Sequence, residues 1–344
     1  MKIETVPRAS YFFPFYLFLS AFIGVHSWFL LPSVSAQEGA PQELAANLVL
    51  GRVLVCAAKD GVILATVDAH GEAGSRPPTV ASLGPMRTGV ILGAVEWVKP
   101  ESTDQPIRLD AEFPRLAAGA ISAAGPGKSS ETASDIESIG VAVLERVRVL
   151  AGQLHGKINL GEDEPLIRII LADYVPGYGP EAWTLDYFVR QDQLASGYWR
   201  TRILRPSYTQ IYPPEKGQPR TLVEVRYPPT DRSKDDPELL DLLKQNDPRL
   251  STIRTASPMI AKSVSFVSEG QSQKSDAMSD INFLKAALPA VVPTDSEITM
   301  GYVDYDKGFQ WVQHPRTPVA AAPPPADAKP REPDAPTLRK KSEQ

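Results

Sequence analysis

Residues 48–67 read LVLGRVLVCAAKDGVILATV, and this stretch decides the fold class. An Asp-Gly turn at Asp60-Gly61 lies between two apolar runs rich in β-branched residues, which predicts an antiparallel hairpin. Both runs, 48–58 and 62–67, are apolar at successive positions, so each strand is expected to be buried on both faces. The fold is therefore expected to place this hairpin between two other layers.

Two more strands are predicted from the apolar runs 79–83 and 89–98, and the four strands together are expected to form an antiparallel meander. Residues 99–133 are rich in Pro, Gly, Ser and Ala without a sustained period, which predicts a loop insertion. Ser134 and Glu137 have the spacing of a capping box and predict the start of a helix that ends near Gly156. The apolar positions at helical spacing are Ile136, Ile139, Val143, Leu144, Val147, Leu150 and Leu154.

The second half of the chain predicts another β block, a short helix, a longer helix and a final hairpin. These elements are expected over 166–174, 182–190, 197–204, 221–227, 236–243, 276–288 and 298–312. The aromatic residues of the β block are expected to lie in the core or in cross-strand pairs rather than to form a ligand platform. They are Trp183, Tyr187, Phe188, Tyr198 and Trp199.

The two ends of the chain differ from the region between them. Lys2 and Arg8 precede an apolar run over 11–32, and Val34 and Ala36 occupy the small-residue positions of a secretory cleavage site. Residues 1–36 are thus expected to be a signal peptide of a periplasmic or extracellular protein, with an uncleaved membrane anchor as the alternative. Residues 315–344 are rich in Pro and Ala and are expected to form a disordered tail, which leaves 37–314 as one domain.

Charge and composition exclude several classes of protein. The formal net charge is −5, and both ends are basic, so the domain over 37–314 carries −8. An acidic domain is not expected to bind nucleic acid. The single cysteine, Cys56, excludes an intramolecular disulfide and a cysteine-only zinc site, and it is expected to be a small buried core residue. No metal and no cofactor is predicted, since the histidines have no ligand spacing and 122–129 departs from a phosphate-binding loop at Ser122.

Several stretches resemble the β subunits of proteasomes and related N-terminal-nucleophile hydrolases. The stretch KDGVILA over 59–65, followed by Asp68 and an EAGS loop over 72–75, is similar to the opening of that family. Similar correspondences occur in the family's order at 166–174, 179–186 and 306–308. The resemblance implies an α+β fold built as a four-layer αββα sandwich, and it also implies a homo-oligomer.

The residues that would carry the family's chemistry are largely missing. The resemblance implies a nucleophilic Thr, Ser or Cys near Gly51, where no Ser or Thr occurs from 44 to 58, and Cys56 lies too far along the strand. The family's lysine is also missing, because Arg76 comes too early and Gly84 stands nearest its place. Asp68 alone matches the family's catalytic set.

The chain is consequently expected to be an exported, non-catalytic binding or assembly module of this family. Its partner is expected to be a protein or peptide, and a membrane contact is expected only through an uncleaved N-terminal segment. Two alternatives are a secreted hydrolase or peptidase whose site differs from the family's, acting through Asp68, and an unrelated β-rich secreted binding module.

Overall fold

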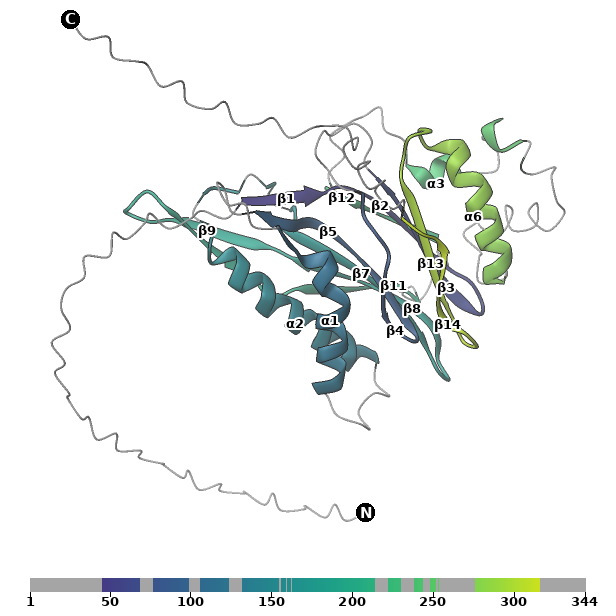
Figure 1. Cartoon of the computed structure of the whole chain (residues 1–344), viewed down its shortest axis with the longest axis horizontal. Coiled ribbons are helices and arrows are strands. Elements are labelled where there is room, and N and C mark those ends of the chain that lie inside the picture. The colour runs from purple at the N-terminus through teal and green to yellow at the C-terminus, as the bar shows by residue number, and fades with distance from the viewer. Residues whose placement is uncertain are drawn as a thin grey trace, which may run out of the picture. The chain divides into compact units, whose positions relative to one another are not determined.

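The computed structural model shows a sheet-rich domain in which every strand pairing is antiparallel (Figure 1). The described residues are 45–68, 77–98, 106–123, 132–154, 156–158, 160–161, 163–213, 222–229, 238–243, 248–251, 253 and 276–315. The expected signal peptide, most of the proline-rich tail, Arg76 and the 72–75 loop lie outside these residues. No helix of the described part is long and apolar enough to cross a bilayer.

The predicted central hairpin is confirmed. Strands β2 (Gly51–Ala57) and β3 (Gly61–Asp68) pair antiparallel, with Gly51 opposite Asp68 and Ala57 opposite Val62. Almost every side chain of the two strands is buried, as the apolar pattern predicts. The pair forms the middle of a five-stranded sheet with the order β12-β2-β3-β13-β14. The outer strands are β12 (Leu222–Tyr227), β13 (Ile298–Asp304) and β14 (Gly308–Gln313).

A second sheet of seven strands packs against the first. Its path is β1-β5-β7-β8-β11, and β4 and β6 also pair with β5. The bounds are β1 (Ala45–Val49), β4 (Ala81–Gly84), β5 (Arg87–Val98), β6 (Ile107–Arg108), β7 (Ile167–Val175), β8 (Gly179–Tyr187) and β11 (Ser207–Tyr212). The predicted four-stranded meander is wrong, because β4 and β5 belong to a different sheet from β2 and β3. Strand β11 was not predicted, since its side chains are mostly exposed and give no apolar pattern.

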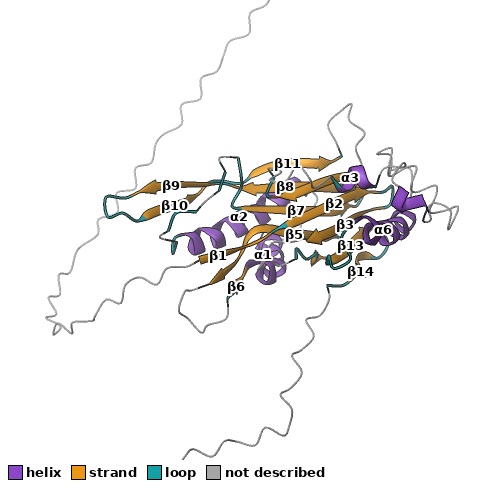
Figure 2. Cartoon of the chain, turned by 90° about the horizontal axis from the view of Figure 1, so that it is seen from above, coloured by secondary structure: helices purple, strands orange, loops and turns teal. Residues whose placement is uncertain are grey.

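A third sheet contains only β9 (Val189–Gln193) and β10 (Trp199–Ile203), which form a hairpin that continues from β8 (Figure 2). Five residues separate the two strands, and Gly197 in that connection has a φ of +86°, a conformation that glycine adopts without steric cost. The sequence predicts strands here but not their separation into a sheet of their own.

Two of the described helices lie against the seven-stranded sheet and the β9–β10 hairpin, and the others lie against the five-stranded sheet. Helices α1 (Leu109–Ala123) and α2 (Thr132–Ala151) pack on each other; α1 contacts β4 and β5, and α2 contacts β10. Helix α6 (Ala277–Val291) contacts β3 and β13, and the short α3 (Leu239–Leu242) contacts β12. A single 3₁₀ turn, η1 (Pro248–Leu250), contacts α6.

The predicted four-layer αββα sandwich is wrong. Strands make up 46% and helices 28% of the described residues, these strands form three sheets, and the four described helices do not flank the sheets as two complete outer layers. The prediction assumed that the doubly buried hairpin needs a full helical layer outside each sheet. The third sheet and the unequal helix coverage arise from segments whose sequence has weak periodicity.

Residues 99–133 are not simply a loop insertion, because they contain β6, α1 and the start of α2. Pro114 and the Gly and Ala residues obscured the helical period of α1. Leu109, Phe113 and Ala117 nevertheless recur every four residues, and all three are buried.

Helix α2 confirms the predicted helix and its apolar face, since all seven predicted positions are buried, but it ends at Ala151, before Leu154 and the predicted end near Gly156. It begins at Thr132, so Ser134 lies within its first turn and the predicted capping box is wrong. Helix α6 and the final hairpin β13–β14 are also confirmed.

Two hydrophobic clusters form the core, and the β2–β3 hairpin contributes to both. Val53, Val55 and Leu64 point into the cluster that includes the seven-stranded sheet, α1 and α2. Leu54 and Ile63 point into the cluster that includes α6 and β13. The alternation of strand side chains thus divides the hairpin between the two clusters.

Candidate functional site

The site suggested by the family resemblance does place Asp68 opposite Gly51, at one end of the β2–β3 hairpin. The Asp68 Oδ1 atom accepts a hydrogen bond from the Glu297 backbone N–H at 2.9 Å, so this carboxylate holds the chain at the start of β13. A Cβ atom on residue 51 would lie 2.6 Å from the Val67 carbonyl oxygen and 2.7 Å from Pro78 Cγ. The position therefore has no room for the side chain of a nucleophile without a shift of the backbone.

The chain also does not start at Gly51. Strand β1 pairs with β5 through Val49, and the chain then passes to the other sheet at Leu50 and Gly51. The α-amine that the family's mechanism needs is thus replaced by a peptide bond between two strands.

The other residues named from the resemblance lie apart from Asp68. Cys56 is fully buried, as predicted, and its Sγ lies 3.7 Å from Asp280 Oδ2 in the core near α6. Gly84, nearest the place of the family's lysine, is the last residue of β4 and pairs with Arg87 of β5. Neither is brought to the end of the hairpin that carries Asp68.

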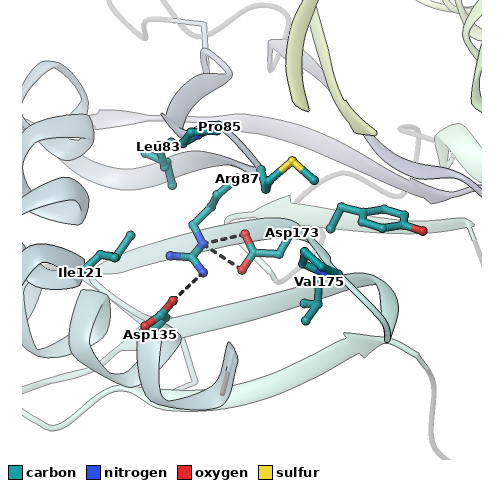
Figure 3. A pocket seen from close by; sticks show the side chains of 11 residues that line it. Leu83, Pro85, Arg87, Ile121, Asp135, Asp173 and Val175 are labelled. Carbon is teal, nitrogen blue, oxygen red and sulfur yellow. Dashed lines mark hydrogen bonds and ion pairs between the residues drawn. The ribbon is translucent and has the colours of Figure 1, made fainter. Parts of the chain in front are cut away.

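A different site is formed where β5, β7 and the first turn of α2 meet. Arg87 begins β5 and lies directly opposite Asp173 of β7 in the register of the seven-stranded sheet. Its Nε atom donates to Asp173 Oδ1 at 2.6 Å and to Oδ2 at 2.8 Å, and its Nη2 atom donates to Asp135 Oδ2 at 3.3 Å (Figure 3). The guanidinium thus bridges two carboxylates from different layers of the fold.

All three charged residues are buried, with 9% of Arg87, 3% of Asp173 and 6% of Asp135 exposed. Burial lowers the pKa of Arg87, but the charges and hydrogen bonds of Asp173 and Asp135 outweigh this effect and raise its pKa above the ordinary value. Burial also raises the pKa of Asp173, against the lowering effect of Arg87. Arg87 stays protonated at all physiological pH values, so one guanidinium faces two carboxyl groups here.

One atom of this group lacks a partner. Asp135 Oδ1 is buried and accepts no hydrogen bond, whereas Oδ2 accepts one from Arg87. A buried carboxylate oxygen without a donor is costly, because its hydration is lost without replacement. The location of Asp135 in the first turn of α2 offsets part of that cost through the helix dipole.

The charged group lies at the wall of a cavity of about 220 Å³ that is otherwise mainly apolar. Figure 3 shows Leu83 and Pro85 on one side of Arg87, with Ile121 and Val175 on others. The full lining is Leu83, Gly84, Pro85, Met86, Arg87, Ile121, Asp135, Asp173, Tyr174, Val175 and Pro176. It contains no Ser, Thr, Cys, His or Lys, so the common nucleophiles and proton-transfer groups other than carboxylate and phenol are missing from the described lining.

Main-chain hydrogen bonds fix the β4–β5 turn that forms one wall. The Pro85 carbonyl oxygen accepts from the Phe309 N–H at 2.6 Å, and the Met86 carbonyl oxygen accepts from the Tyr174 N–H at 3.0 Å. The Tyr174 and Tyr305 rings also pack together, with centroids 5.6 Å apart. The turn is therefore held between β7 and β14, and the cavity is a preformed feature of the fold.

Sequence reasoning missed this site. Arg87 and Asp173 are 86 positions apart, and each looks like an ordinary residue at a strand end. The sequence does show that Arg87 and Asp173 each lie at the border of an apolar run. It does not show that the two strands that carry them pair with each other. Asp135 was visible only as an acidic residue in a helix start.

A second cavity of about 430 Å³ lies near β8, β11 and β12. Of its charged side chains, Arg168 forms two hydrogen bonds with Asp186, and Arg226 Nε donates to Glu224 at 2.7 Å. No group of three His, Cys, Asp or Glu side chains in the described ranges is arranged to hold a metal ion. No protein-family model and no curated protein matches this sequence, so the Arg87 cavity has to be interpreted from its own chemistry.

Proposed function

We propose that residues 37–314 are an exported, non-catalytic binding module whose binding site is the cavity beside Arg87, Asp135 and Asp173. The observation that carries the proposal is the buried Asp135 Oδ1 atom, which lacks a donor in a residue that lines an apolar cavity. A ligand that supplies the donor would remove the cost of that burial.

The cavity favours a ligand group that is apolar along its length and ends in a hydrogen-bond donor. Two carboxyl groups against one guanidinium, with an acceptor oxygen of Asp135 left without a donor, favour a cationic donor head over an anionic one. A lysine or arginine side chain combines an apolar stem with such a head, and stems of this kind commonly pack along apolar surfaces. A basic side chain of a protein or peptide partner is accordingly the proposed ligand.

The described lining of the cavity contains no nucleophile, which supports binding rather than catalysis. The space that a nucleophilic side chain at position 51 would need is filled by Val67 and Pro78, which supports the same reading. A hydrolase acting through Asp68 would have to use a carboxylate whose Oδ1 atom already accepts from the Glu297 N–H.

Titration of the isotopically labelled protein with N-acetyl-lysine-N-methylamide tests the proposal. We expect amide shifts at 83–87 and 173–176 in the NMR spectrum, and weaker or no shifts with the norleucine and glutamate analogues. The norleucine analogue has the apolar stem without the head, and the glutamate analogue reverses the charge.

Asp135→Asn is expected to weaken the lysine response, whereas Glu145→Gln on the exposed part of α2 removes one negative charge without touching the cavity. Thermal unfolding of both variants checks that the fold is retained. Equal responses to lysine and norleucine in the wild-type protein would contradict the proposal without any variant.

A further inference from the structure

The β9–β10 hairpin has one face occupied by its own chain. The Gln191 carboxamide accepts from the Ile158 N–H at 2.8 Å and donates to the Gly156 carbonyl oxygen at 3.2 Å. The Lys157 ammonium lies 5.7 Å from the centroid of the Trp199 ring. The segment that follows α2 therefore covers the face of the hairpin that carries Gln191 and Trp199.

The opposite face carries three arginines around one aspartate. Arg202 lies opposite Arg190 and Arg200 lies opposite Asp192 in the strand register, and alternation puts all four side chains on one face. Arg202 hydrogen-bonds to Asp192, and the carboxylate also lies 3.6 Å from Arg200 Nη2 and 3.7 Å from Arg190 Nε.

The hydrogen bond from Arg202 lowers the pKa of Asp192, so the carboxylate is ionised at neutral pH. Three arginines and one aspartate leave this face with a net charge of +2. The side chains of the arginines are between 52% and 71% exposed. This is a cationic surface in a domain whose net charge is −8.

Apolar and aromatic side chains continue the same face at both ends. Leu194 and Tyr198 lie at the tip and are 41% and 52% exposed, and Leu204 at the base is 46% exposed. The Leu194 N–H donates to the Tyr198 carbonyl oxygen at 2.8 Å, so the ladder extends to the tip. Tyr198, expected in the core or in a cross-strand pair, lies opposite Leu194 across the hairpin and is not part of the core.

We propose that this face, formed by Arg190, Asp192, Leu194, Tyr198, Arg200, Arg202 and Leu204, docks on a membrane surface that contains anionic lipids. Guanidinium groups pair well with lipid phosphates, and tyrosine and leucine at an exposed tip enter the headgroup region at low cost. An acidic polypeptide would also match the arginines, and the experiment below separates it from a membrane. The acidic remainder of the domain is repelled by the same surface, which selects the orientation with the hairpin toward the membrane.

The hairpin extends beyond the rest of the described domain, as Figure 2 shows, so its tip can reach a flat surface without obstruction. The inference concerns a surface other than the Arg87 cavity and is independent of the proposed ligand there.

An environment-sensitive fluorophore at the tip tests the proposal in the full chain. Ser196→Cys gives an exposed thiol for NBD labelling, and the buried Cys56 stays unlabelled in the native protein. Vesicles of 70% phosphatidylcholine and 30% phosphatidylserine are expected to shift the NBD emission to the blue, whereas pure phosphatidylcholine vesicles are not. The emission of the same label at Met278→Cys, an exposed position on α6, is expected not to change. This comparison separates the hairpin from any membrane contact made elsewhere in the chain.

Replacement of Arg190, Arg200 and Arg202 by Gln is expected to weaken the vesicle response at the tip by about tenfold or more, since each basic residue near an anionic surface contributes about fivefold. A control with the same loss of charge replaces Arg108, Arg148 and Lys307, which are exposed at other sites, and is expected to change it less than twofold. Far-UV circular dichroism and the urea midpoint confirm that both triple variants are folded.

The proposal is overturned by no response to anionic vesicles, by an equal response from the label at Met278→Cys, or by a concentration-dependent blue shift without vesicles. The third result would identify the face as a contact between two copies of this chain. A tip response to polyglutamate as strong as that to vesicles would identify an acidic polypeptide as the partner and would also overturn it.

Discussion

Arg87→Met tests whether the three buried charges depend on one another. The variant puts an apolar side chain of similar length in this place and removes the only cation that the described residues bring to Asp173 and Asp135. Removing one partner of a buried ion pair costs about 3–5 kcal/mol, because the remaining charge has lost both its water and its counterion. We expect a loss of this size here, since 3% of Asp173 and 6% of Asp135 are exposed.

Arg108→Met is the matched control. Arg108 donates to Asp110 at 2.8 Å with comparable geometry, but 43% of its side chain is exposed. Exposed ion pairs contribute about 0–1 kcal/mol to stability, so the two variants should differ by at least about 2 kcal/mol. Urea unfolding followed by circular dichroism and by tryptophan fluorescence measures the difference, provided that the slope against urea is unchanged.

The pH dependence gives an independent check. In Arg87→Met the pKa of Asp173 is expected to rise above its already raised native value, because burial then acts without a counterion. A folded-state pKa above the unfolded value means that the folded protein binds more protons, so stability falls as pH rises through that interval. The penalty should therefore be larger at pH 7 than near pH 4. A penalty below about 1 kcal/mol at pH 7, or one that grows on acidification, would refute the reasoning.

Three further measurements test the fold. Asp276→Ala removes the cap of α6, where Asp276 accepts from the Ser279 N–H at 2.9 Å, and it should cost about 1 kcal/mol at pH 7, while Asp276→Asn costs much less. Burial opposes ionisation of Asp276, but the hydrogen bonds from Ser279 outweigh this effect and lower the pKa of Asp276. The carboxylate therefore stabilises the fold above its unfolded-state pKa, and the stability difference between wild type and Asp276→Ala should shrink as pH falls through the lowered pKa. A difference that stays constant with pH would contradict this. The Cys56 thiol should not react with Ellman's reagent in the native protein and should react fully in urea, and rapid native reaction would show that the strand is not buried. Gly51→Ala should destabilise the protein by about 1–3 kcal/mol because of the contacts with Val67 and Pro78, and unchanged stability would mean that this strand start has room for a side chain.

The sequence was a good guide to the elements with strong periodicity. The Asp60-Gly61 hairpin, the apolar face of α2 and the hairpin at β13–β14 are where the sequence predicts them, because burial imposes a period on their side chains. Strand β11 and helix α1 were missed, since an exposed edge strand and an Ala-rich helix with an internal proline show little contrast between their faces.

The arrangement of the sheets and the Arg87 site could not be predicted in the same way. Both depend on which strands pair, and pairing is decided by contacts between positions far apart in the chain, such as Arg87 and Asp173. The hairpin face with Arg190 and Arg202 was within reach, because a two-residue period of arginines in predicted strands indicates a charged face. The family resemblance led instead to Asp68, which the structure shows bonded to the Glu297 main chain.

The β2–β3 hairpin contributes side chains to both hydrophobic clusters, so the stability of one cluster is coupled to the stability of the other. Neither cluster can lose its packing while the hairpin stays in place for the other, so the domain should melt as one cooperative unit and not as two. A substitution such as Val55→Ala or Ile63→Ala should then lower the resistance of distant α6 and α2 to proteolysis together. A substitution in this hairpin would accordingly lower the stability of both clusters, so few substitutions in the hairpin should be tolerated.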